Sequence, residues 1–174
     1  MSSAYLSELT STGLYKKLTL SVPSFKQTDS RWADIRIGTQ GDTIRSSGCT
    51  TTALSMTESF HRGKTVTPAD MVKRLSYSSS GMLYWPTDYA TELVSSSDYL
   101  KKIYAQLSKG KPVILGMKKS NGSQHWVVIT GHKKETASLS AGNFSINDPG
   151  SSTRTLLSEF VAAYPVAYKI AYKK

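Results

Sequence analysis

The clearest pattern of hydrophobic and polar positions in the chain is helical. Residues 95–111 place apolar side chains at positions i, i+3, i+4 and i+7, and Gly110 follows where a helix would stop. The four positions that would share one face are Leu100, Ile103, Tyr104 and Leu107. Residues 50–60 predict a second helix, with Gly63 near its end. A third is predicted from Thr67, because Thr67 suits the N-cap and Pro68 the first helical position.

The second half of the chain changes to short apolar or alternating runs. We expect strands in the segments 16–25, 111–117, 125–132, 138–148 and 166–174, with one further helix over 155–164. In the run 125–132, apolar residues occupy odd and even positions alike, so both faces of the strand are apolar. This pattern predicts a central strand covered on both faces. Helices that mostly precede strands indicate an α+β domain with an antiparallel sheet.

Composition adds limits to this picture. The chain has 174 residues, enough for one compact domain, which we expect over residues 17–174 after a lead-in of residues 1–16. Its single cysteine excludes an intramolecular disulfide. The N-terminus lacks the pattern of a secretory signal, and no apolar run approaches the about 20 residues that cross a bilayer. We therefore expect no transmembrane segment, and synthesis in the cytoplasm without a Sec signal.

The charge is strongly positive. Lys and Arg total 22 against 12 Asp and Glu, a formal net charge of +10. Such a surface attracts polyanions, among them nucleic acids, anionic lipids and anionic cell-wall polymers. The basic residues are spread in pairs without an aromatic RNA-binding motif or zinc-finger spacing, so no specific nucleic-acid recognition is expected.

Cys49 is the most informative single residue. It follows Gly48 at the predicted start of the helix over 50–60, where the helix dipole and free N–H groups stabilise a thiolate. The same N–H groups could hold the oxyanion of a tetrahedral intermediate. Alternatively, Cys49 is a small buried hydrophobic residue beside Ala53. Position alone leaves both interpretations open.

A thiol nucleophile needs a base, and the chain has three histidines. His61 lies at the far end of the same helix, about 18 Å away, and is excluded. His125 and His132 are seven residues apart, so a regular strand would direct them to opposite faces. Alternation places His125 on one face with Val127 and Ile129. His125 is therefore the preferred base, and His132 is expected to be a solvated residue at the strand end.

The third group of a triad would orient the imidazole. Asp148 ends the strand that follows, and an antiparallel hairpin would bring that end beside His125. The alternative is that Asp148-Pro149-Gly150 is only a turn.

Five motifs in order carry a family resemblance: VPSFKQTDSRW, GCTTTALSM, GKPVILGM, HWVVITGH and INDPGS. From about residue 20 to 172 the chain resembles papain-like cysteine peptidases, above all the peptidase domain of double-glycine leader-peptide ABC exporters and its stand-alone bacterial and phage relatives. The resemblance implies a papain-like α+β fold in which the helix carries the nucleophile and the sheet carries His and Asp. It assigns Cys49 as nucleophile, His125 as base, Asp148 as orienting acid and Gln27 as a donor in the oxyanion hole. No cofactor and no metal ion are expected.

The sequence also departs from those relatives. Neither membrane helices nor an ATPase accompany the peptidase segment, and Thr50-Thr51 stands where the family often has Gly-Pro after the cysteine. Leader-peptide processing is therefore not the first expectation. A cationic stand-alone peptidase resembles phage lytic enzymes, which favours a cell-wall peptidoglycan endopeptidase of endolysin type that acts on the wall after release. The alternatives are a protein-directed protease or deamidase of the same fold, and a non-catalytic wall-binding or nucleic-acid-binding module.

Overall fold

The computed structural model describes residues 13–174 of the chain. Most of the lead-in predicted over residues 1–16 lies outside the described residues, and the division between a lead-in and one domain stays a prediction. The helices are α2 (Ile44–Ser47), α3 (Cys49–Arg62), α4 (Pro68–Val72), the 3-10 helix η1 (Ala141–Asn143), α5 (Tyr99–Leu107) and α6 (Leu157–Ala163). The strands are β1 (Leu18–Thr19), β2 (Ser76–Tyr77), β3 (Leu83–Tyr84), β4 (Tyr89–Leu93), β5 (Val113–Lys118), β6 (Gln124–His132), β7 (Phe144–Asn147) and β8 (Val166–Lys173).

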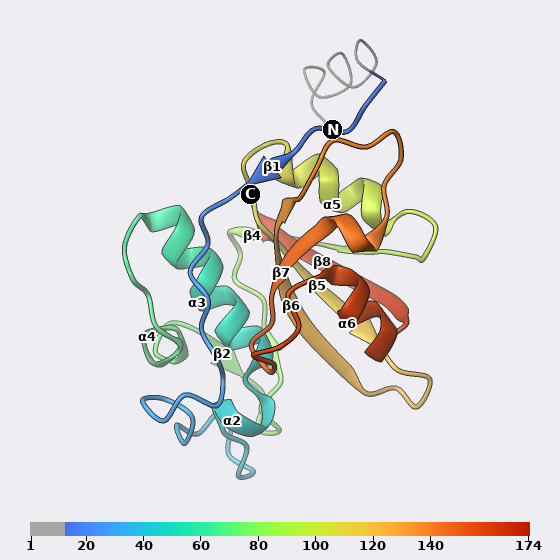
Figure 1. Ribbon diagram of the computed structural model, residues 1–174. Helices are drawn as coiled ribbons and strands as arrows, with labels where there is room; N and C mark the ends of the chain where they lie inside the picture. The colour runs from blue at the N-terminus through green and yellow to red at the C-terminus, as the bar shows by residue number, and fades with distance from the viewer. Residues whose placement is uncertain (1–12) are drawn as a thin grey trace.

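The main structural unit is a six-stranded sheet in the order β1-β6-β5-β8-β4, with β7 also paired to β6 (Figure 1). All of the pairings in it are antiparallel. The strands β2 and β3 form a separate two-stranded hairpin. Helices combined with an antiparallel sheet confirm the predicted α+β class.

The sheet is covered on both faces (Figure 1). α3 packs on one face, where Leu54 and Met56 meet Val128 of β6. α5 and α6 cover the other face, where Ile103 and Phe160 pack with Val127. This arrangement explains the apolar character of β6 at successive positions, because neither face of the strand meets water. The predicted stripe of the helix over 95–111 is also confirmed, since Ile103, Tyr104 and Leu107 are buried in this core.

The junction between α2 and α3 is tight and depends on Gly48. A Cβ on Gly48 would lie 2.6 Å from both the Cα and the carbonyl oxygen of Ile44. Only glycine therefore allows α3 to begin directly at residue 49. The helix runs to Arg62 and ends at Gly63, which has the left-handed conformation of a C-cap (φ 65°). The predicted placement of Cys49 at a helix N-terminus is confirmed.

Residues 76–93 depart from the expectation, because they contain three strands that the sequence pattern did not predict. β4 is the most important of them, since it forms an edge of the main sheet against β8. Its sequence, YATEL, has only one buried residue, Tyr89. Its strand conformation therefore depends on pairing with β8 more than on its own pattern.

Within residues 13–174, no helix combines the length and the apolar character that a membrane crossing requires.

Candidate active site

The candidate site lies where the N-terminal end of α3 meets the adjoining ends of β6 and β7. Nε2 of His125 lies 2.7 Å from Oδ1 of Asp148. The contact follows from the antiparallel pairing of β6 with β7, in which Val128 is opposite Asn147. The predicted hairpin and the proximity of the two side chains are therefore both observed.

Asp148 is fully buried and accepts hydrogen bonds on both carboxylate oxygens. Oδ1 also accepts the N–H of Gly150 at 2.8 Å, and Oδ2 accepts Nη1 of Arg154 at 3.3 Å. Burial opposes ionisation of the carboxyl group, but the hydrogen bond and charge of His125, with Gly150 and Arg154, lower the pKa of Asp148. The carboxylate is thus held as an anion of fixed orientation.

His125 lies between this carboxylate and the thiol of Cys49. Burial opposes protonation of the imidazole, but the interactions with Asp148 and with Cys49 outweigh it and raise the pKa of His125 to about 9. The ring is therefore a cation at neutral pH. Nε2 is used by Asp148, which leaves Nδ1 for the thiol.

His125 lies on the predicted face of β6, together with Val127 and Ile129, but the environment of His132 differs from the prediction. Val127 and Ile129 lie in the core beneath α5 and α6, and the His125 ring packs against Phe160 and Tyr164 of α6 at centroid distances of 5.8 and 5.6 Å.

The expectation of a solvated His132 on the opposite face is wrong. His132 is fully buried, its Nδ1 lies 2.8 Å from the carbonyl oxygen of Lys16, and its ring packs against Tyr104 and Phe144 of the same core. The reason is a register shift between Ile129 and Gly131, which interrupts the alternation of the strand.

Gln27 is buried next to the same site, but its amide nitrogen faces α2. Nε2 donates to the carbonyl oxygen of Arg45 at 2.9 Å and lies 3.4 Å from that of Ile44. Oε1 is buried and has no hydrogen-bond partner in the described chain, residues 13–174. The oxyanion-hole role implied by the family resemblance therefore stays a prediction, and it requires the terminal amide to turn toward Cys49.

Two further residues of the site were not predicted from the sequence. Lys26 extends Nζ to the carbonyl oxygens of Asp148 and Ser151, both at 2.7 Å, and the N–H of Gln27 donates to the carbonyl of Pro149 at 2.9 Å. These bonds connect the segment before α2 to the turn after β7. Gly150 packs on the imidazole, where an added Cβ would lie 2.9 Å from Cε1 of His125. Asp148-Pro149-Gly150 is thus a turn and a packing surface for His125 at once.

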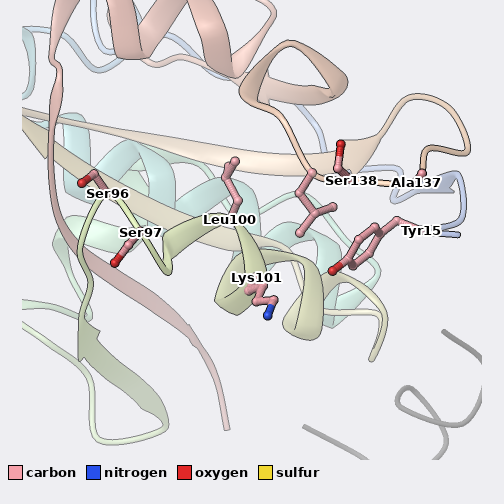
Figure 2. Close-up of a pocket in the computed structure, with 8 residues that line it drawn as sticks. Tyr15, Ser96, Ser97, Leu100, Lys101, Ala137 and Ser138 are labelled. Carbon is pink, nitrogen blue, oxygen red and sulfur yellow. The ribbon is translucent and has the colours of Figure 1, made fainter. Parts of the chain in front are cut away.

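One surface hollow lies elsewhere on the described chain. It has a volume of about 450 Å³, and Tyr15, Leu100, Lys101 and Leu139 contribute to its wall (Figure 2). It is built by α5 and by the loop before η1, and it shares no residue with the candidate site. Among residues 13–174, no group of three or more acidic, cysteine or histidine side chains is arranged to hold a metal ion.

A thiol at a helix N-terminus, with an imidazolium and a buried carboxylate from an antiparallel sheet, is an arrangement typical of cysteine peptidases of the papain-like fold. The family comparison agrees: the model of the Peptidase_C39 like family matches residues 19–172. The chain therefore belongs to this family of papain-like cysteine peptidases. No curated protein sequence matches it.

Proposed function

We propose that Cys49, His125 and Asp148 form the catalytic triad and that the enzyme hydrolyses peptide bonds of cell-wall peptidoglycan. The observation that supports the triad best is the 2.7 Å contact between Nε2 of His125 and Oδ1 of Asp148. The same imidazole also interacts with Cys49, and this interaction helps to raise the pKa of His125. No other cysteine is available in the chain, and His61 and His132 are both outside this arrangement.

The chemistry follows from these positions. The Cys49 thiolate attacks the scissile carbonyl carbon, and the carbonyl oxygen becomes an oxyanion. The N–H groups in the first turn of α3 and a reoriented Gln27 amide would stabilise that charge. The His125 imidazolium gives its proton to the leaving amine as the C–N bond breaks, which leaves an acyl-thioester on Cys49. His125, now neutral, takes a proton from water, the resulting hydroxide equivalent attacks the thioester, and the thiolate and imidazolium are restored.

Asp148 supports both steps by keeping one ring nitrogen of the imidazole, Nε2, in a hydrogen bond. With Nε2 held at the carboxylate, the proton that is transferred must move at Nδ1, on the side of the thiol. The carboxylate also stabilises the imidazolium, since its own charge is maintained in a buried position.

The net charge of +10 is the feature that favours peptidoglycan over a protein substrate. Walls that carry anionic polymers attract a cationic enzyme, and the attraction acts over about 8 Å at physiological ionic strength. The alternative is a protein-directed protease or deamidase of the same fold.

Digestion of purified peptidoglycan tests the proposal. The wild-type enzyme should release fragments whose masses show hydrolysed peptide bonds, while Cys49→Ala should release none and melt at the same temperature. If the Cys49→Ala protein releases the same fragments, the triad is wrong. If wild type releases none although iodoacetamide modifies Cys49 faster than a free thiol, the substrate assignment is wrong and the protein-directed alternative gains support.

A further inference from the structure

Three aromatic rings form a row on the face of the sheet that α3 covers. The ring of Trp126 in β6 lies 5.4 Å from Trp85 and 5.9 Å from Tyr168 of β8, measured between centroids. Gly116 of β5 makes room for the row, because a Cβ there would lie 2.7 Å from the Trp126 ring. The six-membered ring of the indole therefore lies over Gly116 of β5, on the way toward β8.

Two lysines converge on the last ring of the row. Nζ of Lys118 lies 3.8 Å from the centroid of Tyr168, and Nζ of Lys169 lies 5.1 Å from it. Neither ammonium group has a carboxylate within 4.0 Å among residues 13–174. Lys173, farther along β8, differs in this respect because it pairs with Glu58 and Asp88. An aromatic ring attracts a cation but does not neutralise it, so positive charge is concentrated at this end of the row.

The row and the candidate nucleophile border one hydrophobic cluster. Trp126 is a buried member of this cluster, and Cys49, Trp85 and Tyr168 are partly buried residues that pack against it. His125, one residue before Trp126, points to the other face of the sheet. Since the imidazole must face the leaving amine, the acyl part of a substrate would extend away from it, toward the face of the sheet that carries this cluster.

We infer that the row of Trp85, Trp126 and Tyr168, together with Lys118 and Lys169, binds the acyl side of a peptide substrate that carries a carboxylate close to the scissile bond. The partly exposed rings of Trp85 and Tyr168 would cover the apolar part of the peptide, with the buried Trp126 packed between them. The two ammonium groups would bind the carboxylate through charge-assisted hydrogen bonds. This inference rests on the proposed function and specifies the chemical class of its substrate.

Two matched affinity labels test the inference without knowledge of the natural substrate. The labels are peptide chloromethyl ketones that differ only in Glu or Gln at one position, placed second or third from the reactive group. Intact mass measures the second-order rate at which each alkylates Cys49. At low salt, the Glu label should react about three- to tenfold faster than the Gln label at one of these positions. The ratio should fall as salt increases.

The variants Lys118→Met and Lys169→Met should each reduce the ratio, and the double variant should bring it close to one. Lys101→Met is the control, because it removes the same charge at the separate hollow shown in Figure 2. Equal rates for the two labels in wild type at both positions would overturn the inference, and so would an equal loss in Lys101→Met. Failure of the proposed triad is recognised separately, because Cys49 would then react with neutral iodoacetamide no faster than an ordinary thiol. Failure of the peptidoglycan assignment is recognised from the digestion described above.

Discussion

Arg154 donates a hydrogen bond to Oδ2 of Asp148, the carboxylate oxygen that His125 does not use. The carboxylate is therefore shared between an imidazolium inside the site and a guanidinium whose side chain is 31% exposed. Lys26 adds a third cation near Asp148, although burial lowers the pKa of Lys26 against the effect of that carboxylate. These contacts make Arg154 a candidate positioning residue for the proposed triad.

Arg154→Ala is expected to shift the basic limb of the pH profile of hydrolysis to higher pH. Without the guanidinium, a less compensated Asp148 holds the proton on His125 beyond a pKa of about 9. The imidazolium that protonates the leaving amine then persists to higher pH. The limb should move by roughly half a pH unit, given the partial exposure of Arg154.

Arg154→Lys is the matched control, because it keeps the charge and should retain most of the wild-type profile. Rates of peptidoglycan hydrolysis between pH 6 and 10 provide the measurement. A uniform loss of rate at every pH, with the basic limb unmoved in Arg154→Ala, would contradict an electrostatic role.

Substitutions of the two histidines of β6 are expected to have different effects, one on activity and one on stability. His125→Ala should lower the rate of hydrolysis by about 10²–10⁴-fold, the usual contribution of a general base. His132→Ala should instead lower the free energy of unfolding by about 1–3 kcal/mol, because it removes a buried side chain and its contact with the Lys16 carbonyl oxygen, which also accepts the Tyr104 hydroxyl. Activity at low temperature and thermal melting, measured on both variants, separate the two roles. Loss of activity in folded His132→Ala with little loss in His125→Ala would reverse the assignment.

Gln27→Ala is expected to lower kcat by roughly 10²–10³-fold and to change KM much less, as for other oxyanion-hole donors. Gln27→Glu should be at least as harmful, because a carboxylate there would face the carbonyl oxygens of Ile44 and Arg45 and would oppose the oxyanion. The exposed Gln40 offers the control Gln40→Ala, which should behave as wild type. If Gln27→Ala changes only the melting temperature, Gln27 stabilises α2 through the carbonyl oxygens of Ile44 and Arg45 and has no part in the chemistry.

Gly48→Ala is expected to disturb the start of α3. The added methyl group would meet the backbone of Ile44 at 2.6 Å, and relief requires movement of the turn that positions Cys49. The free energy of unfolding should fall by about 1–3 kcal/mol, and Cys49 should react more slowly with iodoacetamide. Gly142→Ala is the comparison, since a Cβ there would meet only Oγ of Ser158 at 4.0 Å. Unchanged stability and reactivity in Gly48→Ala would show that the junction is less constrained than its geometry indicates.

Local sequence patterns were sufficient to place Cys49 at a helix start and Asp148 beside His125. Helical spacing over 50–60 and the glycines around it act between near neighbours, so they can be recognised without the fold. The hairpin of β6 and β7 is also local, because consecutive antiparallel strands bring the end of one to the start of the next.

The remaining features depend on contacts between distant segments, which no local pattern encodes. β4 is a strand because β8 lies beside it, and His132 is buried because a register shift redirects the end of β6. The bonds from Lys26 to the carbonyl oxygens of Asp148 and Ser151 likewise exist only after residues more than 100 positions apart in sequence are brought together. The sequence by itself determined the chemical groups and their local elements. The tertiary structure decided which partners those groups have, because burial and long-range pairing set the energy of each buried charge.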